Sequence, residues 1–188
     1  MSEILVDELQ RVRQSARCLV SLQEMHAAVD KLADELSRDY SERNPVLLTV
    51  MNGAVVFAGQ LLPRLDFLLE IDYLHATRYN NSTAGSDIVW KAKPETELSG
   101  RHVLVLDDIL DEGTTLEAIV DYCRGQGAAS VATAVLVDKQ HDRKARPGLV
   151  ADYTALWLED AYLFGAGMDY KGYWRNAPGI YALAEQDL

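Results

Sequence analysis

Short apolar runs alternate with segments of helical spacing along this chain of 188 residues, and the alternation restricts the folds it can adopt. Strand-like runs that alternate with helices are typical of α/β proteins with a mostly parallel sheet. We expect strands at residues 17–20, 46–51, 68–76, 88–91, 102–106, 131–137 and 153–158. We expect helices at residues 22–40, 54–65 and 115–124, of which the first is opened by the capping box Ser21-Leu22-Gln23-Glu24.

Three segments lie where such a sheet would bind a ligand, because ligands of parallel sheets sit beyond the carboxyl ends of the strands. These segments are Asn52-Gly53, residues 107–115 and the residues that follow Val137. A polar stretch at residues 78–87, rich in Asn, Ser, Thr and Gly, has the composition of a loop. Its length predicts a mobile loop with a role in function.

The segment 103–116 carries the strongest chemical signal in the sequence. An apolar strand leads there into acidic and small polar residues and then into a helix, in the order Asp107, Asp108, Asp111, Glu112, Gly113, Thr114 and Thr115. The start of a helix offers free N–H groups and a partial positive charge, which together bind phosphate. Clustered carboxylates would repel that phosphate unless they bind ribose hydroxyls or Mg²⁺. The segment predicts a ribose phosphate bound with a metal; the alternative is an acidic loop without a ligand.

This fourteen-residue run resembles the ribose-pyrophosphate signature of the type I phosphoribosyltransferases: an apolar strand, two acids, two apolar residues, two variable residues, Gly, one variable residue and Thr. Asp111 matches the hypoxanthine-guanine branch, whereas adenine and orotate enzymes have a small residue there. The resemblance implies a single α/β domain of the type I phosphoribosyltransferase fold, with a mostly parallel central sheet flanked by helices. Its core would span about residues 40–158, with a hood from about 1–39 and 159–188 and a mobile loop at about 78–87.

The activity that this resemblance implies is purine salvage: Mg²⁺-dependent transfer of 5-phosphoribosyl from 5-phosphoribosyl-1-pyrophosphate to N9 of hypoxanthine or guanine. Asp111 would be the catalytic base that takes the proton from purine N7. Ribose and its phosphate would be bound by Asp107, Asp108, Glu112, Gly113, Thr114 and Thr115. The metal would be held by Asp107, Asp108 and Asp169. Members of the family are usually homodimers or homotetramers, and we expect one of these states.

The resemblance extends to positions outside the signature. Met51-Asn52-Gly53-Ala54 resembles the family's first pyrophosphate loop, which often carries a cis peptide bond. Pyrophosphate would be bound by Asn52, Gly53, Arg78, Tyr79, Arg143 and Arg175. The purine would be bound by Lys139 at its 6-oxo group, by the ring of Tyr162, and by Leu163 and Asp169. Three residues depart from the usual pattern: Asn52 stands in place of Lys or Arg, Arg78 in place of Ser, and Glu112 in place of Thr.

Some of these residues have a plainer interpretation when the family is set aside. Lys139 alone is typical of a surface lysine at the end of a strand, and C-terminal aromatic residues are more often found in a core or an interface. The four histidines show no metal-ligand spacing, and we assign no catalytic role to His26, His75, His102 or His141.

Composition and charge exclude several classes of partner. The net charge of −11 disfavours binding to nucleic acid, because an acidic surface repels phosphate backbones. Apolar runs fall short of the ~20 residues that a membrane span requires, and residues 1–10 lack the features of a secretory signal, so we expect a cytoplasmic protein without a membrane partner. Cys18 and Cys123 lie in segments that we expect to be buried, and we expect no disulfide between them.

Three alternative functions stay open. A xanthine-preferring phosphoribosyltransferase would use the same side chains, because Asp111 and Lys139 do not distinguish among the 6-oxopurines. A non-catalytic, nucleotide-sensing regulator on the same fold would bind RNA or DNA through a basic face. An unrelated α/β nucleotide-binding module would form no product from the ribose pyrophosphate.

Overall fold

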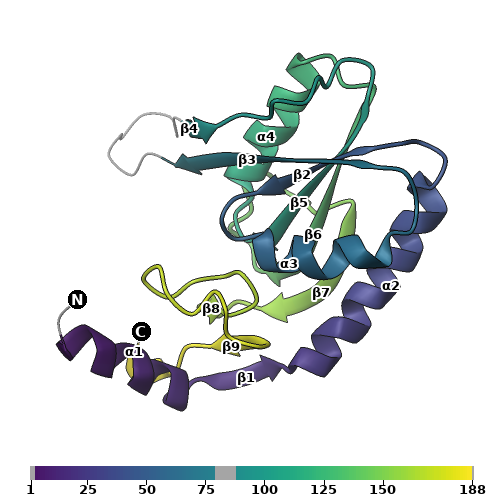
Figure 1. The fold of residues 1–188 in the computed structure, drawn as a ribbon. Helices are drawn as coiled ribbons and strands as arrows, with labels where there is room; N and C mark the ends of the chain where they lie inside the picture. The colour runs from purple at the N-terminus through teal and green to yellow at the C-terminus, as the bar shows by residue number, and fades with distance from the viewer. Residues whose placement is uncertain (1–2, 79–87, 188) are drawn as a thin grey trace.

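The computed structural model of the protein describes residues 3–78 and 88–187 (Figure 1). Its larger sheet has six strands in the order β4-β3-β2-β5-β6-β7. They are β2 (Val46–Val50), β3 (Glu70–Arg78), β4 (Ile88–Ala92), β5 (His102–Leu110), β6 (Ser130–Gln140) and β7 (Tyr153–Glu159). Neighbouring strands run parallel, except that β4 is antiparallel to β3. The mostly parallel sheet that the sequence pattern predicted is confirmed.

Helices cover both faces of this sheet (Figure 1). α2 (Leu22–Tyr40) and α3 (Val55–Leu61) pack on the face that carries Leu47, and α4 (Thr114–Gly125) packs on the face that carries Leu48. Successive residues of a strand point to opposite faces, so the continuous apolar run of β2 contributes to both cores. Within residues 3–78 and 88–187, no helix is both long enough and apolar enough to cross a bilayer.

The two ends of the chain form a second, smaller sheet. It contains β1 (Arg17–Val20), β9 (Ile180–Ala182) and β8 (Leu163–Phe164), in that order and all antiparallel, and α1 (Glu3–Ser15) lies beside it (Figure 1). A third core cluster holds these parts together through Leu9, Val12, Phe164, Tyr170, Ala177 and Tyr181. The chain closes with a 3-10 turn at Glu185–Asp187. The residue limits that we gave for a core and a hood stay a prediction.

The third buried strand is longer than predicted. We expected it to end at residue 106 and Asp107 to begin a loop, but β5 continues to Leu110. The extension pairs with β6, where Asp107 lies opposite Val135 and Leu110 lies opposite Asp138. Regular pairing with a long neighbouring strand outweighs the low strand propensity of aspartate. The acidic pair is therefore fixed on a strand, and the loop begins only at Asp111.

Several other expectations also required adjustment. The helix predicted for residues 54–65 ends at Leu61 and continues as a 3-10 turn, Leu62–Arg64, because Pro63 lacks an N–H group. β3 occupies residues 70–78 instead of 68–76. Cys18 is exposed instead of buried, whereas Cys123 is buried as expected. Apart from the backbone of residue 78, the loop predicted at 78–87 lies outside the described residues.

Candidate active site

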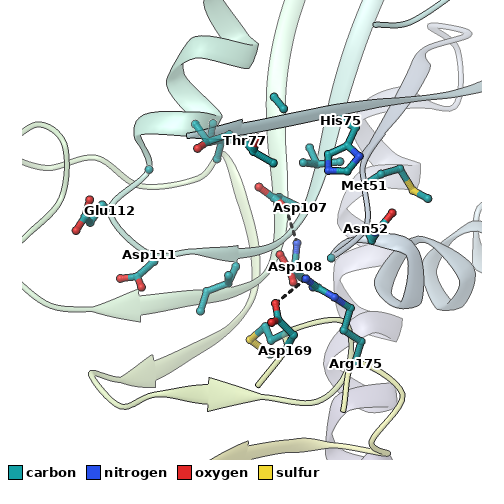
Figure 2. Close-up of a pocket in the computed structure, with 18 of the residues that line it drawn as sticks. Met51, Asn52, His75, Thr77, Asp107, Asp108, Asp111, Glu112, Asp169 and Arg175 are labelled. Carbon is teal, nitrogen blue, oxygen red and sulfur yellow. Dashed lines mark hydrogen bonds and ion pairs between the residues drawn. The ribbon is translucent and has the colours of Figure 1, made fainter. Parts of the chain in front are cut away.

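A cavity of about 620 Å³ opens at the carboxyl ends of β2, β3, β5 and β6, where the C-terminal segment meets the larger sheet (Figure 2). Parallel sheets bind their ligands at this edge. Most of the residues predicted for the site line this cavity: Asn52, Gly53, Asp107, Asp108, Asp111, Glu112, Gly113, Thr115, Lys139, Tyr162, Leu163, Asp169 and Arg175. Residues more than a hundred positions apart in the sequence thus meet at one place.

Asp107 and Asp108 line the cavity near the end of β5 (Figure 2). The backbone N–H of Asp108 donates to Asp107 Oδ1 at 3.0 Å. Burial raises the pKa of Asp107 well above its ordinary value, and the neighbouring charge of Asp108 adds to this rise. Burial also raises the pKa of Asp108. Two adjacent buried carboxylates are costly unless hydroxyl donors or a cation reach them.

Two glycines allow the backbone to pack closely around Asp108. A Cβ atom on Gly53 would collide with the Asp108 carboxylate, and one on Gly167 would collide with the carbonyl oxygen of Gly53. Gly53 follows the cis peptide bond between Met51 and Asn52, which is the feature expected of the first pyrophosphate loop. The loop after β2 and the C-terminal segment are therefore pressed against the end of β5 from two sides.

The turn between β5 and α4 presents a helix start to the cavity. Gly113 is the N-cap residue of α4 and has φ of 90°, in the left-handed region. A side chain there would also collide with Leu149 and Leu110. Because glycine has no side chain to accept from the first N–H groups of α4, an anionic ligand can accept from them instead. The structure thus places a helix start at the edge of the cavity, and phosphate binding at this turn stays a prediction.

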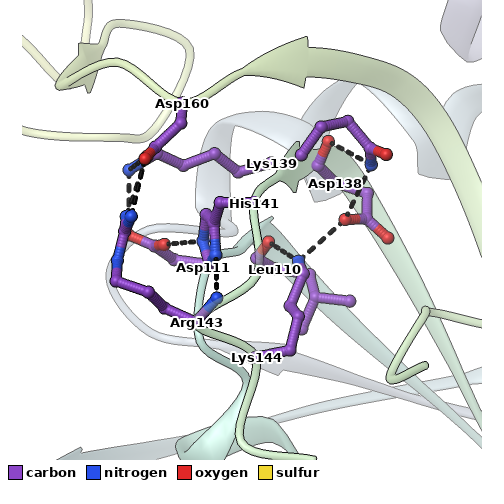
Figure 3. A network of polar contacts seen from close by, with 9 residues as sticks. Leu110, Asp111, Asp138, Lys139, His141, Arg143, Lys144 and Asp160 are labelled. Atoms are coloured by element: carbon purple, nitrogen blue, oxygen red, sulfur yellow. Dashed lines mark hydrogen bonds and ion pairs between the residues drawn. The ribbon is translucent and has the colours of Figure 1, made fainter. Parts of the chain in front are cut away.

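Asp111 belongs to a polar network behind the cavity (Figure 3). Its Oδ2 atom accepts a hydrogen bond from Lys139 Nζ at 3.1 Å, and its Oδ1 atom lies 2.6 Å from His141 Nε2. Burial alone would raise the pKa of Asp111, but the hydrogen bonds from His141 and Lys139 outweigh it and lower the pKa. Asp111 is therefore held as an ionised carboxylate whose two oxygens each have a partner.

The same network includes Arg143, which we predicted to bind pyrophosphate. Its guanidinium donates to both carboxylate oxygens of Asp160, at 2.7 and 2.8 Å. The Oδ1 atom of Asp160, which accepts from Arg143 Nη2, also lies 3.4 Å from Lys139 Nζ. The Arg143 hydrogen bond lowers the pKa of Asp160. Of the predicted residues that the structure describes, Arg143 and Thr114 are absent from the cavity lining.

The C-terminal segment closes another side of the cavity. Arg175 Nη2 lies 2.5 Å from Asp169 Oδ1, and Arg175 Nη1 donates to the carbonyl oxygen of Gly167 at 2.6 Å. Asp169 Oδ2 accepts from the backbone N–H of Gly172 at 2.7 Å. Tyr162 is 44% exposed and lines the cavity. Asp169 is thus paired with a cation and does not join Asp107 and Asp108.

Two predicted positions fall outside what the structure describes, namely Tyr79 and the side chain of Arg78. Several residues of the lining were missed: Met51, His75, Thr77, Lys91 and Met168. His75 and Thr77 lie near the carboxyl end of β3. Thr77 falls beyond the end that we predicted for this strand, whereas His75 lies within the predicted range and was given no role. No group of three His, Cys, Asp or Glu side chains suited to a metal occurs among the described residues.

Comparison with known proteins agrees with this geometry. Residues 18–171 match the family model for the phosphoribosyl transferase domain. The chain is 35% identical over 171 residues to a hypoxanthine-guanine phosphoribosyltransferase of Streptococcus pneumoniae. This alignment covers 90% of the present chain and 94% of the relative. It is 33% identical over 181 residues to a hypoxanthine-guanine-xanthine phosphoribosyltransferase of Tritrichomonas foetus, covering 96% and 95%. The crystal structure of a hypoxanthine phosphoribosyltransferase from Staphylococcus aureus superposes with a TM-score of 0.86 at 25% identity, covering 93% and 95%.

Proposed function

We propose a function for this protein from one premise: the chain belongs to the phosphoribosyl transferase domain family. It transfers the 5-phosphoribosyl group of 5-phosphoribosyl-1-pyrophosphate to N9 of hypoxanthine or guanine, and it releases pyrophosphate with IMP or GMP. One observation carries this proposal above others, namely that Asp111 and Lys139 meet beside the acidic turn that opens α4. A carboxylate that can act as a base and a lysine that can donate to an oxo group thus lie next to the proposed phosphate site. A 6-oxopurine that reacts with a ribose phosphate requires these groups side by side.

The ribose phosphate binds at the turn between β5 and α4. Its 5′-phosphate accepts from the free N–H groups at the start of α4 and from the hydroxyl of Thr115. The ribose hydroxyls donate to Asp107 and Asp108, which relieves the cost of burying two adjacent carboxylates. Positive charge develops on the ribose as the C1–O bond breaks, and these carboxylates lie where they stabilise it.

The acidic pair also fits Mg²⁺, because hard carboxylate oxygens are the ligands that this ion prefers. Asp107 and Asp108 would hold the ion from the protein side, and the ion would supply positive charge that offsets the charge of the pyrophosphate leaving group. Asp169 would join them only after parting from Arg175, whose guanidinium would then be available to the pyrophosphate. Asn52 and Gly53 complete the pyrophosphate site, together with Arg78 and Tyr79.

The purine lies against Tyr162, with Lys139 at its 6-oxo group. A lysine ammonium has three N–H donors. In the structure Lys139 directs two of them at Asp111 and Asp160, which leaves one for the purine oxygen. A 6-amino group cannot accept this hydrogen bond, so adenine is rejected. Asp111 takes the proton of N7 while N9 attacks C1, and the backbone of Leu163 contacts the far edge of the base.

The protein works in the cytoplasm as a homodimer or homotetramer. Large apolar side chains that are exposed on α3 and β3 support an interface between subunits; they include Val55, Ile71 and Tyr73. Light scattering of the purified protein after size exclusion measures the assembled mass. A monomer at micromolar concentration contradicts this part of the proposal.

A second substrate has specific support. The relative from Tritrichomonas foetus is named for xanthine as well as for hypoxanthine and guanine. We therefore include xanthine as an alternative or additional substrate, since Lys139 contacts an oxo group that all three bases share.

An absorbance assay with 5-phosphoribosyl-1-pyrophosphate, Mg²⁺ and one purine at a time tests the proposal. Hypoxanthine and guanine are expected to give nucleotide, and adenine is not. A rate with xanthine comparable to that with hypoxanthine assigns the broader activity. If no 6-oxopurine gives product, while the protein binds RNA tightly and in a salt-sensitive manner, the chain is a regulator on this fold and not an enzyme.

A further inference from the structure

His141 lies directly behind Asp111 in the network of Figure 3. Its Nε2 atom is 2.6 Å from Asp111 Oδ1, and its side chain is only 3% exposed. Asp111 itself is 44% exposed and lines the cavity, whereas His141 is not among the described residues of the lining. His141 therefore contacts the carboxylate from the protein side, while the opposite side of Asp111 faces the ligand.

The backbone of Arg143 determines which ring nitrogen of His141 carries the proton. The Arg143 N–H donates to His141 Nδ1 at 3.0 Å, so Nδ1 is an acceptor and carries no hydrogen. The hydrogen of the uncharged imidazole must then be on Nε2, and it points at Asp111 Oδ1. The contact between His141 and Asp111 is therefore a hydrogen bond donated by the imidazole to an ionised carboxylate, which is a short and strong type.

The other carboxylate oxygen is held from the same segment of chain. Lys139 Nζ donates to Asp111 Oδ2 at 3.1 Å, and Asp160 holds Lys139 from its opposite side at 3.4 Å. Arg143 in turn holds Asp160 through two hydrogen bonds. Residues 139, 141 and 143, at and after the end of β6, thus fix both oxygens of Asp111 and leave its remaining lone pairs for the ligand.

We propose that His141 is a positioning residue: its Nε2–H holds the Asp111 carboxylate in the orientation in which it receives the proton of purine N7. This inference rests on the proposed function, because it assumes that Asp111 is the base. In Ser-His-Asp sites the carboxylate orients the imidazole, and here the imidazole orients the carboxylate. His141 does not relay the proton further, because Nε2 already carries a hydrogen and Nδ1 is occupied by the Arg143 N–H.

Two substitutions of His141 and one control test this role. His141→Leu removes the donor but keeps an apolar body in a buried site, and His141→Gln can place an amide N–H near the position of Nε2. His102→Leu is the matched control, because His102 Nδ1 lies 2.8 Å from Ser130 Oγ on β5 and β6, the strands that Asp111 and His141 directly follow. This pair lies at the first residues of β5 and β6, at the end opposite the cavity. Circular dichroism and the melting temperature establish that each variant is folded.

We expect His141→Leu to lower kcat by about ten-fold to a hundred-fold, while the KM for the ribose pyrophosphate changes by less than about two-fold. His141→Gln is expected to recover kcat to within roughly three-fold of the unmodified protein, and His102→Leu to leave it unchanged. A folded His141→Leu protein with full turnover, or a Gln variant no better than the Leu variant, overturns the proposal. So does a loss that raises both KM values and leaves kcat intact.

A measurement without turnover separates this inference from the proposed function. Nitrogen-15 NMR of the labelled, unmodified protein is expected to show His141 protonated at Nε2 and bare at Nδ1. The reverse tautomer overturns the positioning role even if the protein is an active enzyme. If the unmodified protein makes no nucleotide from any purine, the proposed function fails, and the tautomer then reports the hydrogen bond alone.

Discussion

At the scale of single residues, the carboxyl groups of the site differ in pKa because their surroundings differ. Asp107 and Asp108 are buried side by side, and burial raises the pKa of both. Asp111 accepts hydrogen bonds from His141 and Lys139, which lower its pKa despite partial burial. The first two therefore require donors or a cation from the ligand, whereas Asp111 is ionised before the ligand arrives. Environments that push neighbouring carboxyl groups apart in pKa are typical of divided roles in catalysis.

Replacing Asp111 by Asn tests its role as the base. The substitution keeps the size of the side chain but removes the negative charge that shares the N7 proton. We expect kcat to fall by roughly ten-fold to a thousand-fold while the ribose pyrophosphate still binds. Steady-state kinetics, with calorimetry for binding, measure the two effects separately. Turnover close to that of the unmodified protein rules out Asp111 as the base.

Replacing Lys139 by Ala tests recognition of the purine. The KM for hypoxanthine is expected to rise by about ten-fold or more, because the donor to the 6-oxo group is lost. The KM for the ribose pyrophosphate should change far less. Lys93→Ala is a suitable control, because Lys93 lies over the rings of Trp90 and Tyr122 and is not part of the described cavity lining. Equal increases in both KM values contradict the role of Lys139.

At the scale of elements, local sequence signals and tertiary pairing both set the boundaries. α2 begins and ends at the predicted residues, and its start is fixed by the complete capping box that Ser21 and Glu24 form. The Ser21 hydroxyl accepts the Glu24 N–H at 3.3 Å, and the Glu24 carboxylate accepts the Ser21 N–H at 2.9 Å. The last residues of β5 instead adopt strand structure because they pair with β6. No local sequence pattern indicates this pairing.

Ser21→Ala is expected to destabilise the protein by about 1 kcal/mol and to lower Tm by roughly 2–4 °C. Ser21→Thr, which keeps the hydroxyl, should restore most of the loss. The Ser21 hydroxyl and N–H lower the pKa of Glu24, so this part of the stabilisation exists above the unfolded pKa of Glu and is lost as pH falls through the lowered value. Thermal melts at neutral pH and below about pH 4 should therefore show a smaller difference in the acidic range. An unchanged Tm at neutral pH contradicts the cap.

At the scale of the whole molecule, the two faces of the larger sheet and the small terminal sheet form three separate cores. The two cysteines differ in their exposure to solvent. Cys123 lies in α4 with no exposed surface, and burial raises its pKa to about 11. Cys18 lies on β1 of the terminal sheet and is exposed. Thiol reactivity therefore distinguishes the surface from the core under α4.

In the folded protein, we expect Cys18 to react promptly with a thiol reagent at pH 8, while Cys123 stays protected. The thiolate is the reactive form, and a buried thiol with a raised pKa supplies very little of it. Mass spectrometry of peptides from a time course identifies which cysteine is labelled. Cys123 is expected to react only with the opening of the fold, so its rate should rise with denaturant. Equal rates for both cysteines in the absence of denaturant would show that α4 is not packed as described.

The sequence alone determined the parts of this protein that depend on neighbouring residues. Local periodicity predicts the alternation of strands and helices, and the capping residues predict the start of α2. The order of residues 103–116 predicts the acidic turn before α4. The resemblance of that run to a family then indicated most residues that line the cavity.

Only the tertiary structure decided which residues far apart in the sequence pair or contact each other. The pairing of β1 with β9 unites the two ends of the chain, and the length of β5 depends on β6. Asp111 and His141 are separated by 30 positions, and Asp169 takes Arg175 as its partner instead of joining the acidic pair. Such contacts arise from the packing of separate elements, whose relative placement is fixed by burial and pairing across the whole chain and not by any one segment.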